Sequence, residues 1–580
     1  ACALPAGSAL ASEETSQNTT SGAYAAGTYT ATAPGRNGDV SLTVVFSDCE
    51  LESIEAEHTE SKNIGDVAIE LLIQRAVESQ NLNLDSITGA TLTSAAFMVA
   101  LEDAYGQAGA DVKALEEAES GLEPAPAIDE ECDVVVVGTG GAAYAAAVTA
   151  AEAGKSVIML DKMDIYGGNT NCGEGVINAP DPERQEPMGI EDSVEHFFED
   201  TFEGGDEKAD PELVHIMTDN ALDAIHWMED HGLHYVDEVF TAIGGKWQRG
   251  HEVDVEIKGQ QGGAYYVSCL KACCDDMGVK LYTDAKVEKI STDSAGVVVG
   301  VEGSRPSSGA PVKVTAKSVV LATGGYSWND ELVARLCPEN LNTLHVASIG
   351  STGDGLIMAE EVGAALYENQ WLMGMSYSVS QDGNTLNNLG GPWTISMMVD
   401  RDGNRFMNEN LHPNAYSNMI LRGKGPYYTI VDSSDEAKAA ICEENVGCEY
   451  LVKGDTLEEL AQNAGFDVDT FVGWVYNWNN GIKNGYDAFG ARIAYMAPIE
   501  KGPFYAVRQT PTNMDSMGGI KTNLEAEVLR GDGTSIQNLY AAGAISNGAL
   551  YDTAYMSGSA VLNCYTMGRI AGKNAAALTK

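Results

Sequence analysis

The feature that most constrains the fold is a buried strand followed at once by a glycine-rich turn and an alanine-rich helix. The run Asp133–Val137 is rich in β-branched residues, as in a parallel strand with both faces covered. It leads into Gly138-Thr139-Gly140-Gly141-Ala142, and a second strand, expected over 156–160, ends at Asp161. Glycines let the backbone approach a pyrophosphate, and an acid about 20 residues on binds a ribose hydroxyl. The pattern predicts an α/β, Rossmann-like domain that binds a dinucleotide.

The charge balance excludes whole classes of partner. Acidic residues outnumber basic ones by 85 to 34 in the 580 residues, for a formal net charge of −51. Phosphate backbones and anionic lipids are bound by Lys and Arg, so we expect no nucleic-acid partner and no docking to an anionic membrane surface. Hydrophobic residues make up 44% of the chain, which is enough for large cores.

Residues 1–24 are expected to be an export remnant or a tether. Ala9-Leu10-Ala11 has the small residues of a signal-peptide cleavage site, and Cys2 could instead carry a lipid anchor. An ordinary flexible terminus would explain the same residues. We expect an exported protein, either extracellular or held at the cell surface.

A small α+β unit is predicted over 25–108. Its expected strands and helices cover 28–32, 40–46, 50–57, 66–79 and 92–107. The segment 109–131 follows, and its part from Asp111 onward holds eight acids and one Lys. It is predicted to be a linker, and a larger unit begins at Cys132.

A threonine hydroxyl is expected at the start of a helix in the small unit. The run Asp85-Ser86-Ile87-Thr88-Gly89-Ala90-Thr91 brings it there, where backbone N–H groups suit a phosphate. A Thr in this place is also a common N-cap. The stretch closely resembles the flavin-binding domains of the sodium-pumping quinone reductase and the related electron-transport complex. The resemblance implies FMN bound covalently to Thr91 by a flavin transferase, with Gly89 in the turn and Asp85 supporting the transferase's recognition or a metal. No resident metal is expected.

Further motifs follow the dinucleotide fingerprint in a fixed order. They are Gly167-Gly168-Asn169-Thr170, Leu321-Ala322-Thr323-Gly324-Gly325, Thr352-Gly353-Asp354-Gly355 and Leu539-Tyr540-Ala541-Ala542-Gly543. From about 130 to 580 the chain resembles the flavoprotein superfamily of fumarate reductase, urocanate reductase and 3-ketosteroid dehydrogenase. The resemblance implies a Rossmann-like domain over 132–365 and 512–580 that binds FAD non-covalently. An α+β capping domain over 366–511 would be inserted in it.

The resemblance also assigns cofactor-binding residues. Asn169 and Thr170 would reach the flavin ring and ribityl chain, and Ala560 and Val561 would lie at the pyrimidine end of the ring. Ala544 stands where the family has a Glu, which puts that one FAD contact in doubt. The expected FAD-binding residues are Gly138, Gly140, Gly141, Ala142, Asp161, Lys162, Asn169, Thr170, Gly173, Gly175, Val287, Ala322, Thr323, Gly324, Asp354, Gly543, Ala544, Ser559, Ala560 and Val561.

The anchors that hold a dicarboxylate in fumarate reductases are absent. Tyr555 replaces the carboxylate-binding Arg and Met514 replaces a substrate His, while the segment near Met375 lacks a His and Gly390-Gly391-Pro392-Trp393 lacks an Arg. Without these groups a dicarboxylate would bury unpaired charge, at a cost of several kcal/mol. We therefore expect a substrate other than fumarate.

Four residues are candidates for the chemistry. Tyr555 resembles the Tyr of ketosteroid dehydrogenases that binds the substrate carbonyl, although a packed core Tyr would fit the same position. Tyr377, Asp515 and Arg401 are candidate proton donors. The favoured function is an exported reductase that takes electrons from a membrane-derived donor through FMN to FAD and passes hydride to the activated C=C of a small molecule. A ketosteroid-type dehydrogenase and an electron-transfer flavoprotein without a substrate site are the alternatives.

Overall fold

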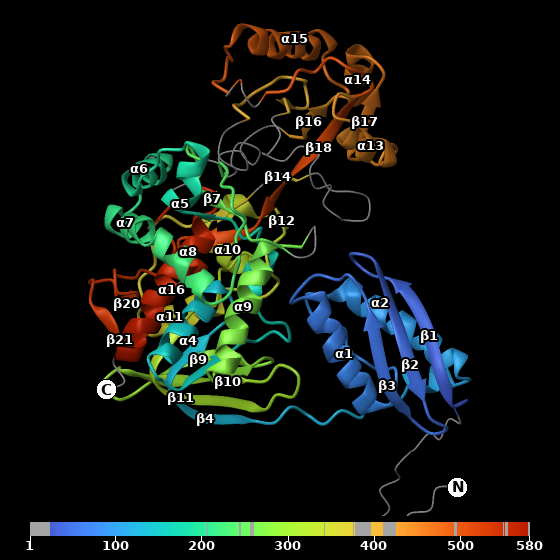
Figure 1. Cartoon of the computed structure of the whole chain (residues 1–580), viewed down its shortest axis with the longest axis vertical. Helices are drawn as coiled ribbons and strands as arrows, with labels where there is room; N and C mark the ends of the chain where they lie inside the picture. The colour runs from blue at the N-terminus through green and yellow to red at the C-terminus, as the bar shows by residue number, and fades with distance from the viewer. Residues whose placement is uncertain are drawn as a thin grey trace, which may run out of the picture. The chain divides into compact units, whose positions relative to one another are not determined.

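The computed structural model describes residues 24–577, apart from 206, 243–244, 256–259, 342, 375, 378–395, 410–424, 492, 494–495, 549 and 552–554. The chain divides into two compact units (Figure 1). The first comprises Ala1–Glu60 and Gly65–Glu123, and the second comprises Ser61–Ile64 and Pro124–Lys580. Among the described residues no helix is long and apolar enough to cross a membrane.

The first unit is an antiparallel sheet of three strands packed against two helices. Its elements are β1 (Gly27–Pro34), β2 (Asp39–Phe46), β3 (Leu51–Glu57), α1 (Gly65–Ser79), α2 (Thr91–Gln107) and α3 (Val112–Glu116). In β2 every second residue from Val40 to Phe46 is buried, so one face of the sheet meets the helices. The Phe46 ring lies 4.8 Å from the ring of Tyr105 on α2. These strands and helices lie within a few residues of the predicted ranges.

The segment predicted as an acidic linker is partly structured. It contains α3, and β4 of the second unit begins at Ile128. The strand starts before the β-branched run because Ile128 pairs with Val312, and Glu131 with Thr315, in β11 (Pro311–Leu321). The first residues of β4 are mostly acidic, so the pattern of hydrophobic residues gave no indication of a strand there.

The second unit is built on an eight-stranded, mainly parallel sheet. Its strands are β4 (Ile128–Val137), β5 (Val157–Leu160), β8 (Lys280–Tyr282), β9 (Lys286–Thr292), β10 (Val298–Ser304), β11, β20 (Glu527–Leu529) and β21 (Ser535–Ala541). The central order is β20-β21-β11-β4-β5-β8, and β9 and β10 extend from β11. The parallel pairings β21-β11, β11-β4, β4-β5 and β5-β8 confirm the predicted Rossmann-like α/β class.

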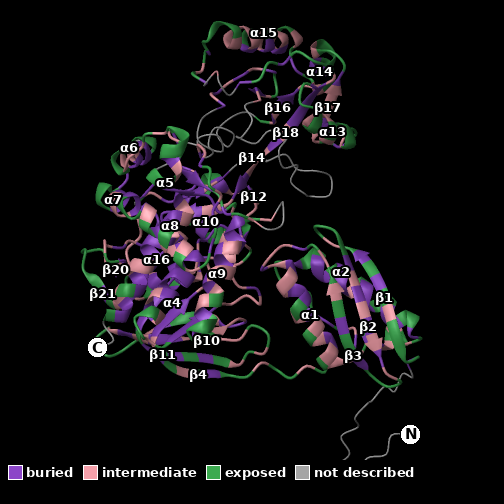
Figure 2. Cartoon of the chain, viewed as in Figure 1, coloured by how far each residue is buried: buried purple, intermediate pink, exposed green. Residues whose placement is uncertain are grey.

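Helices and short strands surround this sheet. They are α4 (Gly141–Glu152), α5 (Pro182–Gln185), α6 (Val194–Gly204), α7 (Pro211–Asp219), α8 (Ala221–Asp230), α9 (Gly262–Asp276), α10 (Asp330–Leu336), α11 (Asp354–Glu361), α16 (Ser559–Ala577), β6 (Ile177–Asn178) and β7 (Gly250–His251). Val134 and Val136 face the cluster formed with α4 and α16, whereas Val135 and Val137 face the opposite layer, which contains β9 and β10. Both faces of β4 are therefore covered along residues 134–137, whereas Asp129 and Glu131 in its first half are exposed. Figure 2 shows the burial of each residue along the chain.

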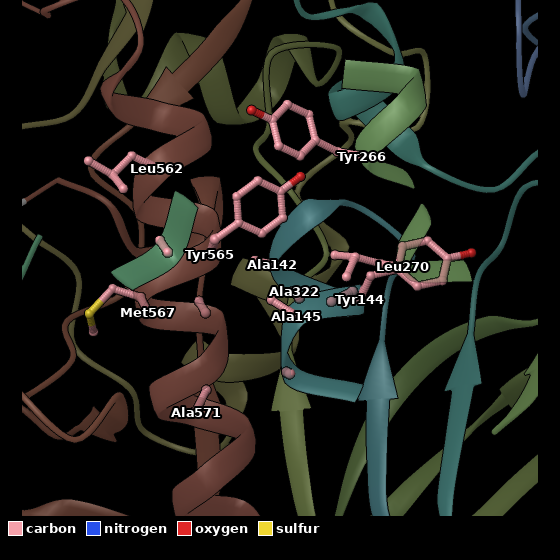
Figure 3. Packing of buried hydrophobic residues seen from close by; sticks show 14 of the residues in the cluster. Ala142, Tyr144, Ala145, Tyr266, Leu270, Ala322, Leu562, Tyr565, Met567 and Ala571 are labelled. Atoms are coloured by element: carbon pink, nitrogen blue, oxygen red, sulfur yellow. The ribbon is translucent and has the colours of Figure 1, made fainter. Parts of the chain in front are cut away.

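Small residues let α16 approach α4 closely. A Cβ at Gly572 of α16 would lie 2.3 Å from the carbonyl oxygen of Ala146 on α4. Figure 3 shows Ala142 and Ala145 of α4 facing Tyr565 and Ala571 of α16. The Tyr565 ring stacks on Tyr266 of α9 at 5.1 Å, which joins a third helix to the pair. This packing holds the start of α4 rigidly at the end of β4.

The capping region is formed mainly by a six-stranded sheet and three helices. Its elements are β12 (Leu344–His345), β14 (Ser376–Tyr377), β15 (Met398–Val399), β16 (Tyr427–Val431), β17 (Leu451–Gly454), β18 (Phe504–Asn513), α13 (Glu436–Glu444), α14 (Leu457–Ala464) and α15 (Val468–Asn484). The boundary predicted at 511/512 falls inside β18. A separate ladder joins β13 (Trp371–Met373) to β19 (Asp515–Met517), which ties the predicted start of the cap to the returning FAD domain.

Candidate active site

The first part of the site is the turn between β4 and α4. Gly140 is the N-cap residue of α4 and has no side chain with which to cap the helix. Gly138 has a φ of +112°, and a Cβ there would lie 2.2 Å from the carbonyl oxygen of Ala322. The Gly141 N–H donates to Thr170 Oγ1 at 2.9 Å, so the two glycine motifs of the sequence meet. Apart from this one bond the glycine turn has no side-chain cap, and a helix N-terminus of this kind is suited to a pyrophosphate.

Asp161 lies at the end of β5, where the ribose-binding acid is predicted. Its carboxylate accepts the Thr139 hydroxyl and the Met163 N–H. Burial raises the pKa of Asp161, and these hydrogen bonds act in the opposite direction. The Ala285 N–H donates to the Asp161 carbonyl at 2.7 Å, which places the start of β9, with the buried Val287, beside the acid.

A second group of polar side chains lies at α11. Lys162 Nζ donates to Thr352 Oγ1 and to Asp354 Oδ2, and the Thr352 hydroxyl also donates to Asp354. Burial opposes ionisation of Asp354, but the hydrogen bond and charge of Lys162 outweigh it and lower the pKa of Asp354. The buried Thr323 hydroxyl has no hydrogen-bond partner among the described residues, so it can bond a ligand.

These residues fit FAD. The glycine turn can hold the diphosphate, and Asp161 can bind a ribose hydroxyl. Lys162, Asp354 and Thr323 supply further donors and acceptors for the ribityl and diphosphate groups. FAD, when bound, would supply the hydride chemistry of its flavin ring.

The first unit offers a site for the second flavin. Thr91 is exposed at the first position of α2, whose N-cap residue is Ala90 and which lacks a side-chain cap. Gly89 before it has a φ of +94°, in the left-handed region, and Asp85 is exposed at the start of the loop. An exposed hydroxyl beside uncapped N–H groups fits a phosphate ester.

Asp515, a candidate proton donor, lies just after the end of β18. It begins β19, is half-buried, and its Oδ1 accepts the Ser516 N–H at 2.8 Å. Burial raises the pKa of Asp515 to about 6, against hydrogen bonds from Ser516 and Asn169. Asn169 Nδ2 also donates to the Met514 carbonyl at 2.9 Å, and Asn169 Oδ1 accepts the Ser348 N–H at 3.0 Å. The predicted flavin-ring residue Asn169 thus holds the strand that carries Asp515.

Tyr555 lies near Asp515, before α16. Its phenol oxygen accepts the Ala560 N–H at 3.2 Å, and its ring meets Tyr551 edge-on at 5.2 Å. Burial raises the pKa of Tyr555 to about 12, and the charges of Cys564 and Asp515 act in the same direction. The hydrogen bond to Ala560 links the phenol to the segment predicted for the pyrimidine end of the flavin.

Arg401, unlike Asp515 and Tyr555, lies in an exposed hairpin turn of the cap. Its guanidinium is 3.8 Å from Asp402. The same turn contacts the connection between α14 and α15, because the Asp467 N–H donates to the Asp402 carbonyl. No contact joins Arg401 to the other candidates in the described part of the chain. The sequence motif around Arg401 did not show that this side chain is exposed in the cap, because the segments that surround the turn are distant in the sequence.

Other predicted residues are only partly placed. Tyr377 pairs with Thr510 through its backbone, but its side chain lies outside the described residues. Residues 1–23, Met375, Gly390–Trp393 and 552–554 also lie outside them. Ala544 begins a 3₁₀ turn after Gly543, and Ser559, Ala560 and Val561 form the start of α16.

Three hydroxyls that bond to segments beside predicted site residues were not predicted, two of them in the second unit and one in the first. Thr139, the variable position of the fingerprint, orients Asp161 and accepts the Gly167 N–H. The Ser516 hydroxyl accepts the Tyr326 N–H. The Ser94 hydroxyl accepts the Ile87 N–H in the loop before α2 and donates to the Ala90 carbonyl. Each lies beside a motif residue, which is the only signal that the sequence carries for it.

The fold and the site together define a class. The second unit has a mainly parallel α/β sheet, a glycine turn suited to a dinucleotide, and a candidate acid and phenol. The first unit presents an exposed threonine hydroxyl suited to a phosphate ester. These are the features of a two-flavin oxidoreductase. Residues 133–562 match the family model described as FAD binding domain, and residues 35–106 match the FMN-binding domain. Because the first match covers most of the chain, the chain belongs to this family of FAD-binding flavoproteins.

Similar proteins of known name place the chain more closely within this class. Urocanate reductase of Eggerthella lenta is 33% identical, over 97% of this chain and 95% of its own. A probable fumarate reductase of Shewanella frigidimarina is 32% identical, over 77% of this chain and 75% of its own. The open conformation of a flavocytochrome c3 fumarate reductase is similar in structure, with a TM-score of 0.64 and 31% identity over 78% of this chain and 79% of its own.

The chain is therefore a fumarate-reductase-like flavoprotein with an FAD-binding and an FMN-binding domain. It is a flavin-dependent oxidoreductase of the group that acts on C=C and CH–CH bonds. More distant relatives include an acrylate oxidoreductase of Vibrio harveyi and a vinyl phenol reductase of Lactiplantibacillus plantarum, which shows that acceptors vary within the group. The predictions of family, fold class, enzyme class and the two flavins are confirmed.

Proposed function

We propose that the chain reduces the C=C bond of a small organic acceptor that carries a conjugated carbonyl and is not a dicarboxylate. Electrons reach FAD from FMN esterified to Thr91. The observation that carries this proposal is the pair formed by Asp515 and Tyr555. Burial raises the pKa of the Asp515 carboxyl to about 6 and that of the Tyr555 phenol to about 12. Asp515 is held by the flavin-motif residue Asn169, and Tyr555 is hydrogen-bonded to Ala560 at the start of α16.

Tyr555 is suited to bind the acceptor oxygen. Because the pKa of its phenol is about 12, the phenol keeps its proton at neutral pH and can donate a hydrogen bond. The acceptor oxygen gains negative charge as hydride arrives at the conjugated carbon. A donor already in place stabilises that charge without further reorganisation.

Asp515 is suited to supply the proton. An acid transfers a proton best when its pKa lies near the working pH, and burial brings Asp515 to about 6. In its neutral form it protonates the carbon next to the carbonyl, while hydride adds to the other carbon of the double bond. The product gains two electrons and two hydrogens, and Asp515 regains its proton from water.

The same pair argues against a dicarboxylate. The pKa of Asp515 reflects burial and two hydrogen bonds, with no Arg, Lys or His contribution among the described residues. The two carboxylates of such a substrate would lose their hydration in this site without a cation beside Asp515 to pair with them. A neutral carbonyl compound carries no such cost.

Steady-state turnover with a reduced viologen donor tests the proposal. Enones, aryl-acrylates, urocanate and fumarate would be compared at equal concentration, with Asp515→Asn and Tyr555→Phe as matched variants. We expect turnover of enone or aryl-conjugated carbonyl acceptors, reduced in both variants. Efficient fumarate reduction would contradict the substrate class, and no turnover of any acceptor would favour an electron carrier without a substrate site.

Export and a membrane-derived donor complete the proposed function. The cleavage-like Ala9-Leu10-Ala11 and Cys2 support a location outside the cytoplasmic membrane. Protease added to spheroplasts, which keep an intact cytoplasmic membrane, should digest the protein. Protection until the spheroplasts are lysed would contradict export.

A further inference from the structure

Four hydroxyl side chains lie within residues 88–94, around the expected flavin attachment residue. They belong to Thr88, Thr91, Thr93 and Ser94. Thr88 and Thr91 are exposed, whereas Thr93 and Ser94 are 2% and 0% exposed. The burial of two of them raises the question of what those two hydroxyls do.

Ser94 ties the loop before α2 to the first turn of the helix. Its Oγ donates to the Ala90 carbonyl at 2.9 Å and accepts the Ile87 N–H at 3.1 Å. The Ala90 N–H in turn donates to the Ile87 carbonyl at 3.0 Å. The three bonds close a small ring around Gly89, and Thr91 leaves it as the first helical residue.

Thr93 is occupied by a different partner. Its hydroxyl donates to Glu60 Oε2, and Glu60 is itself buried, with Oε1 accepting the Asn37 N–H at 3.0 Å. This hydroxyl is therefore turned into the unit, away from any enzyme that would modify it. Thr88 and Thr91 alone of the four stay accessible, and only Thr91 lies at the helix N-terminus.

We propose that Ser94 is a positioning residue for flavin attachment, whose two hydrogen bonds present the Thr91 hydroxyl to the flavin transferase in one conformation. This inference rests on the proposed FMN ester at Thr91. In the attachment, the Thr91 oxygen forms a bond to the FMN phosphorus of a flavin dinucleotide, the phosphoanhydride bond breaks, and adenosine monophosphate leaves. The hydroxyl proton passes to a base. Because the loop is already held in place, the Thr91 oxygen loses less conformational entropy when it takes up the geometry of this displacement.

The test follows flavin attachment to the full-length chain, with purified transferase and excess FAD, by intact mass against time. Ser94→Ala removes both hydrogen bonds, and we expect an initial attachment rate about tenfold lower, as for a loss of about 1.4 kcal/mol. Ser94→Thr keeps the hydroxyl and should restore most of the rate. Ser318→Ala is the matched control, because Ser318 is also fully buried and its hydroxyl donates to the Ala575 carbonyl at 3.1 Å.

The outcomes separate this inference from the proposed function. Wild-type chain that gains no FMN mass would overturn the ester at Thr91 and this inference with it. Attachment to Ser94→Ala at the wild-type rate would overturn only the role of Ser94. If Ser94→Ala does not fold, hydrogen exchange of the wild-type chain decides: the Ile87 and Ala90 amides should be protected, and rapid exchange would contradict the proposal.

Discussion

The hydroxyl oxygen of Ser516 accepts the backbone N–H of Tyr326 at 3.0 Å. This bond joins β19, which carries Asp515, to the turn that follows β11 of the FAD domain. The turn approaches so closely that a Cβ at Gly325 would lie 1.9 Å from Ser516 Oγ and 2.8 Å from Asp515 Oδ1. The position of the acid is therefore set by a glycine turn that lies about 190 residues earlier in the chain.

Gly325→Ala should displace Asp515. The added methyl group has no room beside Ser516, so we expect a loss of about 1–3 kcal/mol of stability and a larger fractional loss of turnover than of FAD content. Thermal unfolding, flavin absorbance and turnover would measure the three effects. Gly531→Ala is the control, since a Cβ there meets nothing within 4 Å. Full activity of Gly325→Ala would show that the geometry around Asp515 is not critical.

Turnover should fall as pH rises through about 6. The pKa of Asp515 is raised to about 6, so its proton-donating form prevails below that pH and is lost above it. Asp515→Asn should lower turnover about 10²- to 10⁴-fold and remove this limb of the profile, whereas Asp515→Glu should keep it. Measurement of kcat between pH 5 and 8 checks both points. An unchanged limb in Asp515→Asn would assign the proton to another group.

Tyr555→Phe should lower turnover about 10²- to 10³-fold, the usual loss for one hydrogen-bond donor to a developing oxyanion. FAD content and the melting temperature should change little, because the ring and its contact with Tyr551 remain. A packed core tyrosine would give the opposite pattern, with loss of stability and normal turnover. Comparison of kcat with the thermal midpoint distinguishes the two.

Thr91→Ala should abolish covalent FMN while leaving FAD bound. The ester needs the Thr91 hydroxyl, and the N-cap residue of α2, Ala90, has no hydroxyl that could replace it. Intact mass after production with the flavin transferase should show one added FMN in the wild-type chain and in Thr91→Ser, and none in Thr91→Ala. Persistent FMN mass in Thr91→Ala would place the attachment elsewhere, and peptide mapping would locate it.

Sequence motifs and hydrophobic periodicity correctly predicted the FAD-binding and FMN-binding domains. The run at Val134 predicted a strand with both faces covered, and the structure places its alternate residues in two separate cores. The prediction failed where polar residues form strands, as at Glu131 of β4, because pairing with β11 has no hydrophobic signature. The sequence also did not show that Asp515 contacts Asn169 whereas Arg401 lies exposed in the cap, since both residues stand in plausible local motifs.

The sequence by itself determined the class of fold and the two flavin domains, because glycines, β-branched runs and the threonine loop act through local backbone geometry that neighbouring residues alone dictate. Only the tertiary structure decided which acid faces the site and how acidic it is. The pKa of Asp515 depends on burial and on Asn169, hundreds of residues away in the chain. Desolvation is a property of everything packed around a group, and no local pattern records it.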